Sequence, residues 1–240
     1  MNREHLLPAL FPSGWTEQSS TAHSFTGTGQ VGDTTVQVIG SSDAAEVGGD
    51  LALLMADAVL DTIHNHPRRP ILFLLDTQGQ RLRRRDEMLG LNGYMAHLAK
   101  CVEIARHRGH PIISLVYGQA VSGGYLTTGM MADACYALAD AEIKVMNLPA
   151  MARITKIPLK RLEELAARSP VFSPGVDNYF RMGHVLEVWS SDLAASLQTA
   201  LATLGTRKGA ADEDRRMQLG LERGGRSLAR PVVEKVLAHA

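Results

Sequence analysis

Two continuous apolar runs stand out in the hydrophobic pattern of the chain, at 69–79 and at 112–117. Each run is too short for a typical helix, so each predicts a strand that is buried on both faces. An earlier segment at 34–40 alternates β-branched with polar residues and predicts a further strand. The pattern therefore indicates a sheet whose central strands are covered on both sides.

Apolar residues at helical spacing fill the gaps between these strands. They predict helices at 51–64 and at about 93–108, and a Gly-Gly pair opens another apolar helix after residue 121. Alternation of strand and helix implies right-handed crossovers and parallel strands. The fold class that this pattern predicts is α/β.

The pattern changes on either side of this region. Residues 1–30 mix Pro, Ser, Thr and Gly without apolar periodicity, which predicts an irregular N-terminal arm. After Asp133 the sequence predicts short strands at 134–139, 143–146 and 185–188, and helices at 158–168 and 174–182. We therefore expect three parts: an arm at 1–30, a core at 31–190 and a helical C-terminal extension at 191–240.

Composition narrows the classes of function. Lys plus Arg equals Asp plus Glu at 25 each in 240 residues, so the overall charge favours neither nucleic acid nor a membrane surface as a partner. Pro and Gly break the N-terminus too often for a signal peptide, and no segment reaches the ~18 apolar residues of a membrane span. Cys101 and Cys135 lie in apolar or helical contexts, which argues against disulfides and a metal site. We expect a cytoplasmic protein that binds no metal.

The Gly-Gly turn is the strongest candidate for chemistry. A helix that begins at Gly123 and Gly124 presents unpaired backbone N–H groups at its positive end, with no side chains in the way. Such donors suit the oxyanion that forms on a reacting thioester or ester carbonyl. Gly79 and Gln80 form a second candidate amide pair, because the carboxyl ends of parallel strands meet at one edge of a sheet. Close packing or an ordinary turn would explain the same glycines without any chemistry.

Four motifs, taken in order, resemble the crotonase (enoyl-CoA hydratase/isomerase) superfamily. They are D-T-Q-G at 76–79, Y-G-Q-A-V-S-G-G-Y at 117–125, L-P-A-M-A-R-I-T-K at 148–156 and S-P-V-F-S-P-G at 169–175. The first two are similar to the oxyanion-hole loops of carboxyltransferases that act on acyl thioesters. The last two resemble the gamma subunits of biotin-independent malonate decarboxylases. The resemblance covers roughly 30–190 and implies a crotonase-like ββα spiral fold.

The same resemblance implies an activity and a set of partners. Malonate would be carried as a thioester on the phosphoribosyl-dephospho-CoA arm of an acyl-carrier delta subunit, in a system that also contains an acyl-carrier transferase alpha subunit. A beta and gamma pair would then remove CO₂ from malonyl-S-carrier and leave acetyl-S-carrier. This chain would be the gamma member of that heteromeric complex, with no directly bound cofactor and no biotin. Gly79, Gln80, Gly123 and Gly124 would stabilise the thioester enolate.

Residues beside the glycines complete the candidate site. Thr77 and Gln78 are candidates to orient the loop or a carboxylate, and Ser122 and Tyr125 flank the glycine pair as substrate-binding candidates. Ser122 would be a nucleophile in a Clp-type protease of the same fold, but no histidine that follows it has the context of a catalytic base. A helix N-cap is therefore the favoured role for Ser122.

Other readings of the chain stay open. An enoyl-CoA hydratase or isomerase would use an acid/base glutamate such as Glu142, but no paired carboxylate lies in a matching loop. A non-catalytic scaffold subunit would supply one wall of a site whose chemistry belongs to its partner. The arginines at 81, 83, 84 and 85 suit the phosphates of the carrier arm, and they equally suit a solvated loop or intersubunit salt bridges.

Overall fold

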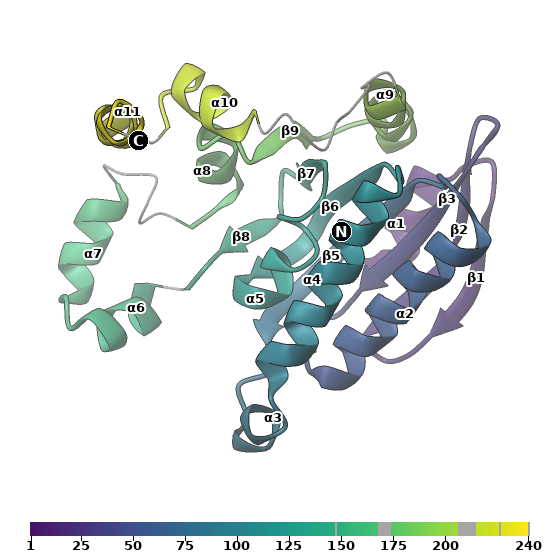
Figure 1. The fold of residues 1–240 in the computed structure, drawn as a ribbon, viewed down its shortest axis with the longest axis horizontal. Coiled ribbons are helices and arrows are strands. Elements are labelled where there is room, and N and C mark those ends of the chain that lie inside the picture. The colour runs from purple at the N-terminus through teal and green to yellow at the C-terminus, as the bar shows by residue number, and fades with distance from the viewer. Residues whose placement is uncertain (147, 168–173, 206–214, 226, 240) are drawn as a thin grey trace.

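A sheet of nine strands runs through the molecule, with helices on both of its faces (Figure 1). The computed structural model describes residues 1–146, 148–167, 174–205, 215–225 and 227–239. The main path of the sheet runs through β1 (Trp15–Ser20), β2 (Ser24–Val31), β3 (Thr34–Ser41), β5 (Ile71–Gln80), β6 (Ile112–Val121), β7 (Ala134–Leu138) and β9 (Val185–Trp189). Two short strands extend it, because β4 (Ala45–Val47) pairs with β5 and β8 (Glu142–Lys144) pairs with β6.

The strand directions confirm the predicted α/β class. β1, β2 and β3 are antiparallel neighbours, and every pairing from β3 through β5, β6 and β7 to β9 is parallel. Helices α2 (Gly49–Asn65) and α4 (Leu91–His107) supply crossovers between the parallel strands. Because parallel strands share one direction, the ends of β5 and β6 lie at the same edge of the sheet.

β5 shows why an unbroken apolar run becomes a central strand. Its side chains alternate between two cores: Ile71, Phe73 and Leu75 pack in the core that contains α2 and α4. Leu72 and Leu74 pack in the opposite core, beside α1 (Arg3–Leu10) and α9 (Leu193–Gly205). The strand is therefore buried on both faces, as its sequence predicts.

The N-terminal arm is regular, so the prediction of an irregular segment at 1–30 was wrong. α1 is capped by the Asn2 side chain and buries three leucines, and β1 and β2 follow it. The glycines of β2 favoured a loop in the sequence, yet they make room for aromatic rings: a Cβ at Gly29 would lie 2.2 Å from the ring of Phe11. Tertiary packing thus places a strand where local propensity is weak.

Most of the described residues after β8 are helical, and two of these helices lie where the sequence predicts them, at 158–168 and 174–182. The helices of this part of the chain are α6 (Leu148–Thr155), α7 (Leu159–Ala166), α8 (Val176–Arg181), α9, α10 (Arg216–Glu222), η1 (Ser227–Ala229) and α11 (Arg230–Leu237). The motif at 148–156 forms α6, whereas most of the motif at 169–175 lies outside the described residues. Figure 1 shows α6 and α7 standing apart from the sheet. The division of the chain into three parts stays a prediction.

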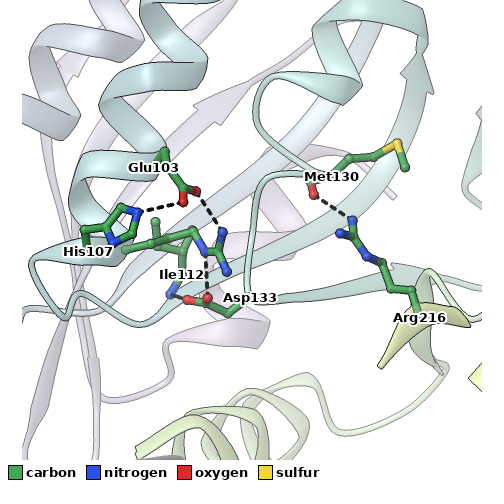
Figure 2. A network of polar contacts seen from close by, with 7 residues as sticks. Glu103, His107, Ile112, Met130, Asp133 and Arg216 are labelled. Carbon is green, nitrogen blue, oxygen red and sulfur yellow. Dashed lines mark hydrogen bonds and ion pairs between the residues drawn. The ribbon is translucent and has the colours of Figure 1, made fainter. Parts of the chain in front are cut away.

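A network of hydrogen bonds and ion pairs lies at the edge of the sheet where β6 begins (Figure 2). Asp133 accepts from Arg106 Nε at 2.8 Å and from the N–H of Ile112 at 2.9 Å, and Arg106 also pairs with Glu103 at 2.7 Å. Burial alone would lower the pKa of Arg106, but its contacts with Asp133 and Glu103 raise that pKa, so the guanidinium stays charged. The network ties α4 to the first residue of β6, at the edge opposite Val121.

Candidate active site

The two glycine motifs meet at the carboxyl edge of the sheet, as the parallel topology predicts. The first motif ends β5, and the second forms the end of β6 and the start of α5 (Ser122–Leu126). Gly79 has a φ of +97° and lies so close to the second motif that a Cβ would be 2.9 Å from the carbonyl oxygen of Val121 and 3.2 Å from the Cβ of Ser122. Only glycine fits this backbone and this space.

A hydrogen bond joins the candidate residues Gln80 and Gly123 directly. The N–H of Gly123 donates to Oε1 of Gln80 at 2.9 Å. The expectation of an unpaired amide at Gly123 was therefore wrong. The sequence could not show this contact, because it depends on the orientation of a side chain 43 positions away.

Gly79 and Thr77 form a second internal pair. The N–H of Gly79 donates to Oγ1 of Thr77 at 3.0 Å, and the Thr77 hydroxyl donates to the carbonyl of Ala45 at 2.7 Å. A Cβ at Gly124 would lie 2.7 Å from Oγ1 of Thr77. Thr77 is buried, and its hydroxyl links β4, the Gly79 turn and α5. Its role in substrate binding stays a prediction, and its contacts are those of a positioning residue.

Ser122, the first residue of α5, has a strained backbone conformation. Its φ is +48°, a left-handed value that is uncommon for a residue with a side chain. Val121 holds the N-cap position of α5, so the prediction that Ser122 is the N-cap was wrong. Among the described residues, no histidine lies within hydrogen-bonding distance of the Ser122 hydroxyl, so a serine nucleophile gains no support.

Gln78 and Tyr125 lie in opposite environments. Gln78 is exposed at the edge of the sheet, and its role in substrate binding stays a prediction. Tyr125 is buried, with its hydroxyl 3.3 Å from Sγ of Cys135 and its ring edge-on to those of Tyr179 and His184. Burial raises the pKa of Tyr125 well above its usual value. The substrate-binding role proposed for Tyr125 stays a prediction, because its hydroxyl faces the core.

Asp76, the first residue of the D-T-Q-G motif, is a positioning residue of the candidate site that its sequence context alone does not reveal. Its Oδ1 accepts the N–H of Gln119 at 2.8 Å, and its Oδ2 accepts the N–H of Ala44 at 3.0 Å. The carboxylate thus connects β6 and the loop before β4 to the end of β5. An acidic residue that closes a buried apolar run was the signal available in the sequence, because a carboxylate that is partly buried there needs such donors.

Tyr117 also contacts this part of the sheet, from the core that contains α1 and α9. Its hydroxyl donates to the carbonyl of Ser41 at 2.7 Å. Burial, and then the negative charges of Asp76 and Asp43, raise the pKa of Tyr117 above its usual value. The neutral phenol therefore remains a hydrogen-bond donor in the folded chain at neutral pH.

Of the arginines at 81, 83, 84 and 85, two form ion pairs and two are exposed. Arg81 lies 3.3 Å from a carboxylate oxygen of Asp50 and 3.7 Å from one of Asp86. Arg83 pairs with Glu46 at 3.0 Å. The other two arginines of the cluster are exposed on α3 (Arg84–Met88), which extends beyond the end of the sheet (Figure 1). Contact of the cluster with the phosphates of a carrier arm stays a prediction.

Glu142, the candidate acid of a hydratase, is engaged in an ion pair. It lies on β8 opposite Gln119 of β6, and its carboxylate is 2.8 Å from the ammonium of Lys144. Within the described ranges, no three His, Cys, Asp or Glu side chains gather as a metal ion would require, and metal independence stays a prediction. In the same part of the chain, each helix is too short or too polar to cross a membrane.

Known proteins are similar to this chain in sequence and in fold. A family model described as malonate decarboxylase gamma subunit matches residues 42–240. The malonyl-S-ACP:biotin-protein carboxyltransferase MADD of Malonomonas rubra is 32% identical in an alignment of 229 residues, and the match covers 84% of this chain and 78% of that protein.

Solved structures extend the likeness to three dimensions. A Pseudomonas malonate decarboxylase hetero-tetramer in complex with coenzyme A matches with a TM-score of 0.75 at 26% identity, over 98% of this chain and 97% of that chain. The Pseudomonas MdcD-MdcE hetero-dimer matches with a TM-score of 0.73 at 26% identity and the same coverage. The transcarboxylase 12S core shares the fold, with a TM-score of 0.72 at 18% identity over 86% of this chain and 42% of that chain. These likenesses confirm the predicted crotonase-like fold.

Proposed function

Because this chain belongs to the malonate decarboxylase gamma subunit family, we propose that it acts with a beta subunit to convert malonyl-S-acyl-carrier protein to acetyl-S-acyl-carrier protein. The related Pseudomonas hetero-dimer supports a partner of this kind. A delta subunit would carry the thioester on its phosphoribosyl-dephospho-CoA arm, loaded with the help of an alpha subunit, in the cytoplasm. The coenzyme A in a related complex supports a substrate with such an arm.

One observation carries the proposal: the two candidate oxyanion loops pack against each other, joined by the hydrogen bond from Gly123 to Gln80. In decarboxylation the bond between the α-carbon and the carboxylate breaks, and its electron pair delocalises onto the thioester oxygen as an enolate. CO₂ leaves, and a proton later restores the α-carbon. An enzyme accelerates this step by stabilising the enolate oxygen more than the substrate oxygen.

The residues at this edge suit that chemistry because it needs donors and no nucleophile. We place Gly79, Gln80, Gly123 and Gly124 in the catalytic cluster, with Gln78 and Ser122 beside it. A single well-aimed donor lowers such a barrier by roughly 3 to 4 kcal/mol. The internal contacts of Thr77 and Asp76 hold the cluster in place.

Reconstitution with the beta subunit tests the function. We expect the purified pair to release CO₂ from a malonyl thioester in a single step and to leave the acetyl thioester. Measurement of labelled CO₂ and of the acetyl product by mass spectrometry gives the stoichiometry. A folded, assembled pair that releases no CO₂ would contradict the proposal.

The Malonomonas relative supports a second candidate, in which the carboxyl group passes to biotin on a protein instead of leaving as CO₂. Both reactions begin with the same bond cleavage and the same enolate. Avidin separates them, because it sequesters biotin. We expect CO₂ release by the reconstituted pair to be unchanged by avidin, and a requirement for a biotinylated acceptor would establish the carboxyltransferase.

A further inference from the structure

One end of the Gln80 carboxamide is fixed by the protein. A backbone N–H can only donate a hydrogen bond, so the atom that receives the N–H of Gly123 at 2.9 Å is the carboxamide oxygen. The nitrogen, Nε2, therefore occupies the other end of the group. The orientation of this side chain follows from a hydrogen bond to the backbone at the start of α5.

The other end of the carboxamide is open. Among the described residues, Nε2 of Gln80 donates to no protein acceptor, and it is not sealed in the core, so solvent reaches it. Its two N–H groups lie at the carboxyl edge of the sheet, in the loop cluster where the thioester oxygen is proposed to bind. A donor at this place is available to a ligand.

The backbone that carries Gln80 is also held firmly. Gln80 pairs with Val47 of β4, and the N–H of Arg81 donates to the carbonyl of Val47 at 2.9 Å. The guanidinium of Arg81 then reaches Asp50 and Asp86. The side chain is thus anchored at its tip by Gly123 and at its base by β4, which is the arrangement that an oxyanion donor needs.

We propose that Nε2 of Gln80 is an oxyanion donor of this site, and that the N–H of Gly123 anchors Gln80 instead of contacting the substrate oxygen itself. This inference rests on the proposed function. Direct use of the Gly123 amide would first require its hydrogen bond to Gln80 to break, whereas Nε2 has no acceptor to release in the part of the chain that the structure describes. The bond that Oε1 accepts also polarises the carboxamide and strengthens its N–H donors.

The step needs no further reactant. As the bond to the carboxylate breaks, the electron pair that it leaves forms the enolate, and the negative charge collects on the thioester oxygen. Nε2–H of Gln80 donates a hydrogen bond to that oxygen while CO₂ departs. No bond forms to the protein, and no group is oxidised or reduced.

Two substitutions at Gln80, made in the complex with the beta subunit, test the donor. Gln80→Glu keeps an oxygen that can accept from Gly123 but replaces the donor with a carboxylate oxygen. Gln80→Leu removes both functions. We expect each to lower kcat for malonyl thioester decarboxylation by about 10²- to 10³-fold, with a smaller change in KM.

The pH profile of Gln80→Glu separates a donor from a structural support. The ordinary pKa of a glutamate is about 4.3, and only its protonated form can donate to the oxyanion. We expect the ratio of variant to wild-type kcat to rise as the pH falls from 7.5 to 5. A residue that merely supported the turn through its oxygen would give a flat ratio.

Gln18→Leu is the matched control, because Gln18 lies on β1 and its Oε1 also accepts a hydrogen bond, from Gln37 Nε2 at 2.9 Å. It should leave kcat unchanged. If both Gln80 variants keep the wild-type kcat, the proposal that Nε2 of Gln80 is an oxyanion donor is wrong. A rise in kcat/KM for Gln80→Leu would also contradict it, because it would show that Gln80 blocks the Gly123 amide. An inactive wild-type pair would contradict the proposed function, whereas an active wild-type pair with active Gln80 variants contradicts only this inference.

Discussion

The carboxylate of Asp76 fills the space that a side chain on Gly118 would need. A Cβ at Gly118 would lie 2.4 Å from both Cγ and Oδ1 of Asp76. The same carboxylate receives the N–H groups of Ala44 and Gln119, so its position is fixed from two sides. The C-terminal parts of β5 and β6 are therefore held together next to the candidate site.

We predict that Gly118→Ala destabilises the chain by about 1 to 3 kcal/mol, because the new methyl group must displace Asp76 or the strand. Denaturant unfolding measures the loss. Gly93→Ala is the control, since it adds the same methyl group inside α4 where nothing lies within 4 Å, and it should gain up to about 1 kcal/mol. Equal stability of the two variants would show that the carboxylate of Asp76 is free to move.

Ser122 gives a prediction about strain. Its φ of +48° disfavours a side chain by about 1 to 2 kcal/mol, and a β-branched side chain is disfavoured most. We therefore expect Ser122→Val to be less stable than Ser122→Gly by about 1 to 3 kcal/mol. Thermal unfolding of the two variants side by side checks the difference. Similar midpoints would mean that the turn relaxes to a different backbone conformation.

The buried phenol of Tyr125 predicts a loss of stability at high pH. Burial raises the pKa of Tyr125, so the folded chain keeps a proton that the unfolded chain releases above about pH 10. The free energy of unfolding therefore falls as the pH rises above that value, by up to about 1.4 kcal/mol per pH unit for this group.

Tyr125→Phe tests this assignment, because phenylalanine has no proton to lose. We expect the variant to be less stable near pH 7, where it lacks the contact with Cys135, and to lose less stability than the wild type between pH 9 and 11. Unfolding midpoints measured across this range give both slopes. Identical slopes would assign the alkaline loss to other groups, such as the buried Tyr117.

The sequence predicted the framework of this site well, because its strands carry strong signals. The apolar residues of β5 allow few alternatives to a central strand, and the parallel order then brings its end close to the end of β6. The N-terminal arm escaped prediction because β2 is a strand only through the rings that pack against its glycines. Local propensity carries no record of such packing.

The pairing of donors and acceptors in the site was beyond sequence reasoning. Gly79 and Gly123 were recognised as amide donors, but each amide is paired by a side chain, Thr77 or Gln80, whose direction depends on tertiary structure. A glycine at a helix start has an unpaired backbone N–H only when no nearby side chain accepts a hydrogen bond from it. The D-T-Q-G motif supplies Thr77, and Gln80 follows it directly. The first residue of the motif, Asp76, holds β6 and the loop before β4 at the end of β5.

The two glycines of the turn should respond differently to alanine. Neither has a positive φ, so only the added methyl group matters. At Gly123 it would lie 2.9 Å from Oε1 of Gln80, the tip of a side chain that can move. At Gly124 it would lie 2.7 Å from Oγ1 of Thr77 and 3.1 Å from the backbone of Gly79, which are both held in place.

We therefore predict that Gly124→Ala costs about 1 to 3 kcal/mol of stability, whereas Gly123→Ala folds normally and loses activity. In the complex with the beta subunit, Gly123→Ala should assemble as the wild type does and lower kcat by about 10²-fold or more, because it displaces Gln80. Unfolding curves, gel filtration and CO₂ release together give the comparison. Full turnover by an assembled Gly123→Ala complex would favour a scaffold subunit, since the chemistry would then belong to the partner.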